Sequence, residues 1–136
     1  GFIVCYSSDD LTLTSFSING QLLACCDTAE ELKAFRISSD GRVIITGGSR
    51  CIVVMRFIHS LEIANTGPRK GLDSILDGTL ISDENNTFDS PIRSLYLTKS
   101  ELHLFVGLES GEVRILLQDS AYLRRRLQDK LMEIGI

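Results

Sequence analysis

Histidine and cysteine are scarce in this chain, and their spacing excludes the usual zinc sites. Among 136 residues there are two histidines and four cysteines. No cysteines stand in C-x-x-C spacing, so the common Cys and His ligand patterns are missing. The residues concerned are Cys5, Cys25, Cys26, Cys51, His59 and His103. We interpret the cysteines as reduced thiols packed as small apolar groups, which favours a cytosolic protein over a disulfide framework.

Signatures of catalysis and of cofactor binding are also missing. The chain has no G-x-S-x-G turn, and its two histidines lie in or beside strand patterns, so a Ser-His-Asp triad is not expected. The segment GPRKGLDS (67–74) lacks the spacing of a phosphate-binding loop. The acidic stretches DSILDG and SDENNTFD do not match a calcium loop. We therefore expect no enzymatic activity, no cofactor and no metal.

The chain also lacks an excess of basic residues and a long apolar run. Fourteen Lys and Arg stand against 18 Asp and Glu, which gives a net charge of -4 and a pI near 5.1. Nucleic acid is therefore not expected as a partner, because phosphate binding needs clustered positive charge. No run approaches the length of a membrane span, and GFIVCYSSDD lacks the pattern of a secretory signal. We expect a cytoplasmic location.

Three segments of the chain follow one pattern, which predicts a repeated β module. They are IVCYSSDDLTLTS from Ile3, IITGGSRCIVVMR from Ile44 and FVGLESGEVRILL from Phe105. Each reads as an apolar strand, a polar turn and a second strand with alternating apolar residues. The corresponding residues are Leu11, Ile52 and Val113, and then Leu13, Val54 and Ile115. The offsets are 52 − 11 = 41 and 113 − 52 = 61 residues, and one WD-repeat propeller blade takes ~40–45 residues.

The other strand patterns fit around this frame. Leu32 to Ser38 and Ile92 to Thr98 are expected as the innermost strands of two blades, and Gly20 to Cys26 as an outer strand after an Asn-Gly hairpin turn. The sequence thus predicts an all-β fold of about three consecutive blades (partial) over residues 1–118: three strands of one blade, a whole blade from Leu32 to about Ile63 that ends in an outer strand, and three strands of the next. Blade ends fall near 27 and 64, and a helix covers 119–136. A long loop covers 65–91, with one helical turn or a short strand expected in LDSILDGTLI. A small β-sandwich is the alternative fold.

Tryptophan is absent, so the repeats lack the dipeptide that names the WD family. The dipeptide would fall at Thr14-Ser15, Met55-Arg56 and Leu116-Leu117. The buried Asp-His-Ser-Trp hydrogen-bond network of typical blades cannot form without it. We therefore expect the blades to be held together mostly by apolar packing between sheets.

The C-terminal segment 120–134 changes from strand to helix periodicity. Apolar Leu123, Leu127, Leu131 and Ile134 recur at helical spacing. The basic residues on the other face are Arg124, Arg125, Arg126 and Lys130. These four are candidate contacts for an acidic partner or for acidic lipid. Docking of the apolar face on the blades is the competing hypothesis.

The sequence also resembles the C-terminal WD-repeat propeller of BEACH-domain proteins of the neurobeachin and LRBA type. The resemblance rests on SINGQLLA, ISSDGRVIITGG, RSLYLTKSELHLFVGLESGEVRIL and YLRRRLQDKL. It implies that the chain is part of a very large cytosolic scaffold with further blades and a BEACH domain upstream. It also implies a role in vesicle traffic and membrane organisation, with protein partners and peripheral contact on endomembranes.

Two classes of function remain open from the sequence. The first is a non-catalytic protein-interaction module, and the second is a small β-rich ligand-binding or enzymatic domain that uses the loop 65–91. The first blade starts one strand late and the last ends one strand early, so we expect two open sheet edges. Such edges are templates for pairing with another chain.

Overall fold

The computed structural model of the protein describes residues 1–64, 74–76, 79–81, 87–117, 128, 131 and 132. These residues form eleven β-strands, which confirms the all-β fold class for this part of the chain. The strands are β1 Phe2–Ser7, β2 Thr12–Ser17, β3 Leu22–Asp27, β4 Leu32–Ile37, β5 Val43–Gly48, β6 Val54–Phe57, β7 Ser74–Leu76, β8 Thr79–Ile81, β9 Ile92–Leu97, β10 His103–Leu108 and β11 Val113–Leu117.

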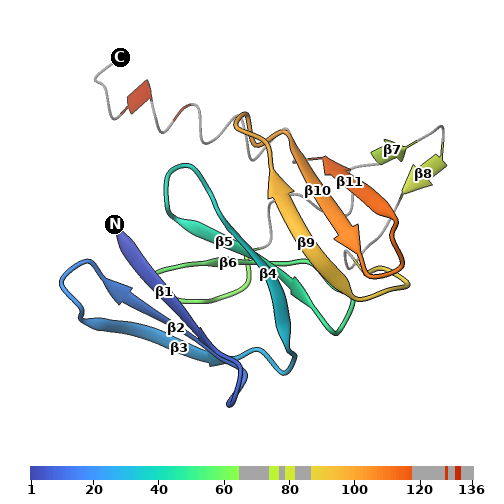
Figure 1. Ribbon diagram of the computed structural model, residues 1–136. Coiled ribbons are helices and arrows are strands. Elements are labelled where there is room, and N and C mark those ends of the chain that lie inside the picture. Colours follow the sequence, from blue (N-terminus) through green and yellow to red (C-terminus); the bar gives the residue numbers. More distant parts are fainter. Residues whose placement is uncertain (65–73, 77–78, 82–86, 118–127, 129–130, 133–136) are drawn as a thin grey trace.

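Nine of these strands make three antiparallel sheets of three strands each (Figure 1). The first sheet has the order β1-β2-β3, the second β4-β5-β6 and the third β9-β10-β11. Strands β7 and β8 form a separate pair within segment 65–91. Neighbouring strands in each sheet are also neighbours in sequence, because short hairpin turns connect them.

The turn chemistry agrees with the sequence at two positions. Between β2 and β3, Gly20 has φ +85° and its N–H donates to the Ser17 carbonyl over 2.9 Å. Between β4 and β5, Gly41 has φ +73° and its N–H donates to the Ser38 carbonyl, also over 2.9 Å. Glycine adopts positive φ without a steric cost, so these residues permit the tight reversals.

The second sheet lies between the other two, and its central strand β5 is buried on both faces. All six residues of β5 are buried, and its alternate side chains enter two different apolar clusters. Ile45 packs in the cluster shared with the third sheet, and Ile44 packs in the cluster shared with the first. Burial on both faces explains the continuous apolar run Val43 to Ile45, because a strand with one solvated face would alternate with polar residues.

Equivalent backbone hydrogen bonds frame the second and third sheets. They are Ser38 N–H to Val43 C=O (3.0 Å) and Thr98 N–H to His103 C=O (3.1 Å), and then Ser49 N–H to Glu31 C=O (3.0 Å) and Glu109 N–H to Pro91 C=O (2.9 Å). Each pair is related by the same shift in sequence, 98 − 38 = 60 and 109 − 49 = 60 residues. The two sheets therefore repeat one backbone pattern.

At the turns, the structural repeat corrects the alignment made from the sequence by one residue, whereas β1 and β5 keep the expected offset of 43 − 2 = 41 residues. The turn after the first aligned strand of each segment holds one residue with positive φ, namely Leu11 (59°), Cys51 (64°) and Gly111 (93°). These positions give offsets of 51 − 11 = 40 and 111 − 51 = 60, in place of 41 and 61. The sequence alignment matched apolar residues with one another and so paired Leu11 with Ile52. Hydropathy carries no information on the backbone φ angle at the turn, which pairs Leu11 with Cys51.

The outer edge of the second sheet also differs from the expected whole blade. Beyond β6, the chain makes a single antiparallel bridge between Arg56 and Ile63 instead of a fourth strand. Segment 65–91, expected as a loop with one helical turn or short strand, contains the β7–β8 pair and a bridge from Thr87 to Ile52. In segment 119–136, the described residues Gln128, Leu131 and Met132 have helical backbone. The helix as a whole lies outside the described residues and stays a prediction.

Candidate interaction surface

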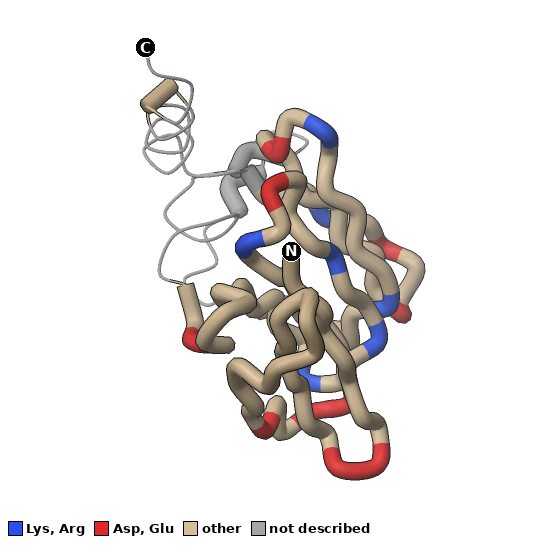
Figure 2. The backbone as a smooth tube through the Cα atoms, turned by 90° about the vertical axis from the view of Figure 1, so that its left-hand side faces the viewer, with Lys and Arg blue, Asp and Glu red and all other residues tan. Residues whose placement is uncertain are grey.

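The basic residues singled out from the sequence cannot be placed. Arg124, Arg125, Arg126 and Lys130 lie outside the described residues. Over the described backbone, basic and acidic positions are interspersed (Figure 2). No helix in the described part is long and apolar enough to cross a membrane.

The cysteines and histidines do not come together in a site. Among the described residues, no group of three or more His, Cys, Asp and Glu side chains could hold a metal ion. All four cysteines are free thiols, as expected. Cys5 and Cys25 are nevertheless exposed, so the expectation that they are packed is wrong. His59 lies beside the Phe57 ring, with 6.0 Å between ring centroids.

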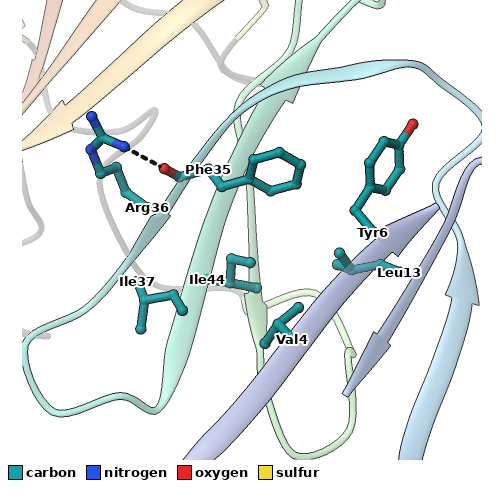
Figure 3. A pocket seen from close by; sticks show the side chains of 7 residues that line it. All are labelled: Val4, Tyr6, Leu13, Phe35, Arg36, Ile37 and Ile44. Atoms are coloured by element: carbon teal, nitrogen blue, oxygen red, sulfur yellow. Dashed lines mark hydrogen bonds between the residues drawn. The ribbon is translucent and has the colours of Figure 1, made fainter. Parts of the chain in front are cut away.

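An apolar groove separates β1 of the first sheet from β4 of the second (Figure 3). We call it the β1–β4 groove, and its cavity volume is about 400 Å³. It is lined by Val4, Tyr6, Leu13, Phe35, Arg36, Ile37 and Ile44. Arg36 points away from the other lining side chains, toward the Phe35 carbonyl oxygen, to which its guanidinium donates over 2.8 Å. The remaining lining is aliphatic and aromatic.

Tyr6 joins the two sheets at this groove. Its hydroxyl donates to the Glu30 carbonyl oxygen over 3.0 Å and accepts from the Leu32 N–H over 3.1 Å. Its ring lies 5.6 Å from the Phe35 ring, between centroids, at an interplanar angle of 54°. Such tilted aromatic pairs are favourable beyond simple burial. The apolar part of Tyr6 thus lines the groove while its hydroxyl fixes the chain that enters β4.

Glu30 accepts further hydrogen bonds in the segment to which the Tyr6 hydroxyl is bonded. Its side chain is buried and accepts a hydrogen bond from the Arg50 N–H over 3.2 Å. Its carbonyl also accepts from the Thr28 hydroxyl over 2.9 Å. Burial raises the pKa of Glu30 above its usual value, and the bond and charge of Arg50 counteract part of this rise. The residue holds a turn in place.

Cys26 contacts the apolar cluster between the first and second sheets. Burial raises the pKa of its thiol, and the nearby charge of Arg56 opposes that change. A raised pKa reduces the thiolate population at neutral pH, and the thiolate is the reactive form of cysteine. Cys26 therefore acts as a packing residue.

The chemistry of the groove suits apolar contact and backbone pairing. Its lining places no nucleophile beside a base, since its polar groups are the Tyr6 hydroxyl and the Arg36 guanidinium. Sequence reasoning missed the groove, because its residues come from four strands whose relative placement the sequence does not specify. The exposed apolar residue Ile37 at the end of β4 was the available signal.

Comparison with known proteins finds weak sequence similarity to a much larger protein and clear structural similarity to solved structures. No family model matches the chain. It is 32% identical over 63 residues to BEACH domain-containing protein B of Arabidopsis thaliana, a match that covers 46% of this chain and 2% of that protein. The fold resembles the computationally designed Ika4 protein, with a TM-score of 0.60 and 13% identity over 87% of this chain and 61% of that one.

These comparisons agree with parts of the sequence analysis. The structural match shows a shared all-β fold, and nothing about function follows from 13% identity. The region aligned with BEACH domain-containing protein B spans only 2% of that protein's length, so the chain corresponds to a small part of this relative.

Proposed function

We propose that the chain is part of a WD-repeat type β-propeller and serves as a non-catalytic protein-interaction scaffold. The observation that carries the proposal is the repetition of one three-stranded sheet, with equivalent turn hydrogen bonds, in successive packed layers. Stacked sheets with matching internal order are the architecture of propellers, which present edges and loops to partners. A sandwich does not require such equal modules.

We also propose that this scaffold is part of a large cytosolic protein, which the weak similarity to a BEACH domain-containing protein supports. In that setting the chain acts in vesicle traffic and membrane organisation, and it binds other proteins and further segments of its own protein. The four basic residues of 119–136 contribute contacts to an acidic partner or to acidic lipid on endomembranes. The competing hypothesis, a ligand-binding or enzymatic domain that uses segment 65–91, has less support, because the groove is built by residues of β1, β2, β4 and β5.

Proximity labelling tests the scaffold function directly. The chain is fused to a labelling enzyme, expressed in cultured cells and compared with the same enzyme fused to an unrelated β-domain of equal size. We expect proteins of endomembranes and vesicle coats to be enriched by the chain. Equal labelling by the two fusions would contradict the proposal.

A thermal-shift panel distinguishes the two function classes. Nucleotides, divalent metals and vesicles containing phosphatidylserine are added to the purified chain. Binding to the native state raises the melting temperature in proportion to the logarithm of ligand concentration. We expect no shift with nucleotides or metals. A reproducible, saturable shift with either one would favour the ligand-binding class.

Liposome pelleting tests the basic residues by themselves. The chain is compared with the double variant Arg124→Glu, Arg125→Glu on vesicles with and without phosphatidylserine. If the basic face contacts lipid, charge reversal abolishes pelleting on the acidic vesicles. If the helix docks on the sheets, pelleting is absent for both proteins.

A further inference from the structure

The first strands of the second and third sheets differ in charge from the rest of the chain. Strand β4 is LKAFRI and β9 is IRSLYL, and together they hold three basic residues and no acidic residue. The whole chain has more acidic than basic residues, with a net charge of -4. Strand β4 packs directly against β9. We call Lys33, Arg36 and Arg93 the β4–β9 basic row, and all three residues are exposed.

Two residues of this row occupy equivalent places in successive sheets. Lys33 and Arg93 are 93 − 33 = 60 residues apart, which is the repeat of the two sheets. In the ladder of β4 with β5, the residues on either side of Lys33 have partners, whereas Lys33 has none. The ladder of β9 with β10 skips Arg93 in the same way. Such a β-bulge leaves the extra residue unpaired and redirects its side chain. The fold thus presents one basic residue at the same bulge in each sheet.

The cations of the row are available to an external partner. Within the described residues, the Arg93 side chain makes no ion pair or hydrogen bond. The Arg36 guanidinium donates to the Phe35 carbonyl oxygen over 2.8 Å, which leaves its other N–H donors unused, and it points away from the β1–β4 groove (Figure 3). The Lys33 ammonium lies 3.0 Å from a carboxylate oxygen of Glu31, and both side chains are exposed. Exposed ion pairs contribute little, so an external carboxylate can displace Glu31.

The spacing of the row favours an extended acidic segment over a single anion. Lys33 and Arg36 are three residues apart along β4, which is about 10 Å at ~3.3 Å per residue. One phosphate or carboxylate group is too small to contact both cations. An extended chain with acidic side chains at every second position repeats its charge about every 7 Å and can contact several cations at once. Arginine also donates two parallel hydrogen bonds to one carboxylate.

We propose that the β4–β9 basic row binds an extended segment of a partner protein that is rich in Asp and Glu. The inference deepens the proposed scaffold function, on which it rests, by naming the chemistry of a partner and the strands that bind it. Complementary charge of this kind governs specificity and association rate, and salt screens it. The binding is therefore sensitive to ionic strength.

Peptide binding to the whole 136-residue chain tests the proposal. The probe is a short fluorescein-labelled peptide of alternating Glu and Thr, and the control peptide has Gln in place of every Glu. Both are titrated by fluorescence anisotropy at low ionic strength. We expect saturable binding of the acidic peptide alone, and we expect its affinity to fall as salt is added.

A pair of double variants locates the binding site. Arg36→Gln, Arg93→Gln should weaken binding about tenfold, because two ion pairs with the peptide are lost. Arg50→Gln, Lys99→Gln is the matched control, since it removes the same charge at two exposed turn positions outside the row. We expect the control to change the affinity by less than about twofold. All four positions are exposed, so circular dichroism should report the same fold for both variants.

A gain of affinity provides a second test. Glu31→Gln should strengthen peptide binding about two- to fivefold, because it frees Lys33 from its internal partner. Glu112→Gln is the matched control, since Glu112 forms a 2.7 Å ion pair with Arg114 outside the row. It removes the same charge and the same kind of ion pair, and we expect a smaller change in affinity.

Several results would overturn the proposal. They are the absence of saturable binding, equal binding of the two peptides, equal effects of the two double variants, and equal effects of the two glutamate variants. Binding to phosphatidylserine vesicles that Arg36→Gln, Arg93→Gln abolishes, without binding of the acidic peptide, would assign the row to a membrane surface and also overturn it. Failure here leaves the proximity-labelling result unaffected, so failure of the row and failure of the scaffold function can be distinguished.

Discussion

The Tyr6 hydroxyl provides a direct test of how the first two sheets are held together. The substitution Tyr6→Phe removes one oxygen atom and keeps the aromatic ring that faces Phe35. The Glu30 carbonyl loses one donor but retains the Thr28 hydroxyl at 2.9 Å. The Leu32 N–H loses the 3.1 Å acceptor that Tyr6 supplies. The loss of stability therefore comes mainly from one backbone donor, the Leu32 N–H, which is left without the Tyr6 acceptor.

The magnitude follows from the partial burial of this donor. A buried N–H left without an acceptor costs about 1–3 kcal/mol, and a typical net hydrogen bond contributes about 1 kcal/mol. The Tyr6 to Leu32 bond is only partly buried, so water replaces some of the lost interaction. We expect Tyr6→Phe to lower the free energy of unfolding by about 1–2 kcal/mol.

Urea denaturation followed by circular dichroism measures this change. Tyr96→Phe is the matched control, because Tyr96 is 56% exposed on β9. We expect the control to change stability by less than about 0.5 kcal/mol, as is usual for surface substitutions. An unchanged denaturation midpoint for Tyr6→Phe, or an equal shift in both variants, would refute the view that this hydroxyl joins the sheets.

Three further substitutions probe close packing, charge burial and the core. Gly48→Ala should destabilise by about 1–3 kcal/mol in urea denaturation, because its new Cβ would clash with the Glu31 carbonyl oxygen, a backbone atom. Wild-type stability of this variant would contradict the close backbone approach. Glu30→Gln tests the raised pKa of Glu30. We expect the free energy of unfolding of the native protein, relative to that of the variant, to be greatest below pH 4.5 and to fall as pH rises through the folded-state pKa. A difference that does not change with pH would argue against the raised pKa. Ile45→Ala should cost about 2–5 kcal/mol by calorimetry or urea, since Ile45 is 1% exposed between the second and third sheets; a cost below 1 kcal/mol would show that the site collapses around the cavity.

Local sequence signals predicted the strands and the hairpin turns well. Asn19-Gly20 forms the expected reversal, because this turn depends on residues adjacent in sequence and on glycine's access to positive φ. The strands predicted at Leu32 to Ser38 and Ile92 to Thr98 are found as Leu32–Ile37 and Ile92–Leu97. Alternation of apolar residues is sufficient to detect such strands.

Features that depend on contacts between sheets could not be predicted in this way. The one-residue shift of the repeat is fixed by backbone geometry at Leu11 and Cys51, where residues with side chains adopt positive φ. The bridge at Ile63 replaces a predicted strand, because extended residues become a strand only where a neighbour offers a continuous ladder. The β1–β4 groove requires the relative placement of two sheets, which no local pattern encodes.

The polar contacts between sheets give the β1–β4 groove a defined shape. Apolar packing is non-directional, so the clusters on either side of β5 alone would tolerate sliding of one sheet over the next. Hydrogen bonds are directional and therefore prevent this sliding. Tyr6 joins the first sheet to the chain entering β4, and the Ser39 hydroxyl donates to the Glu101 carboxylate between turns of the second and third sheets. These contacts hold β4 at a set distance from β1, so the groove between the two strands keeps its shape.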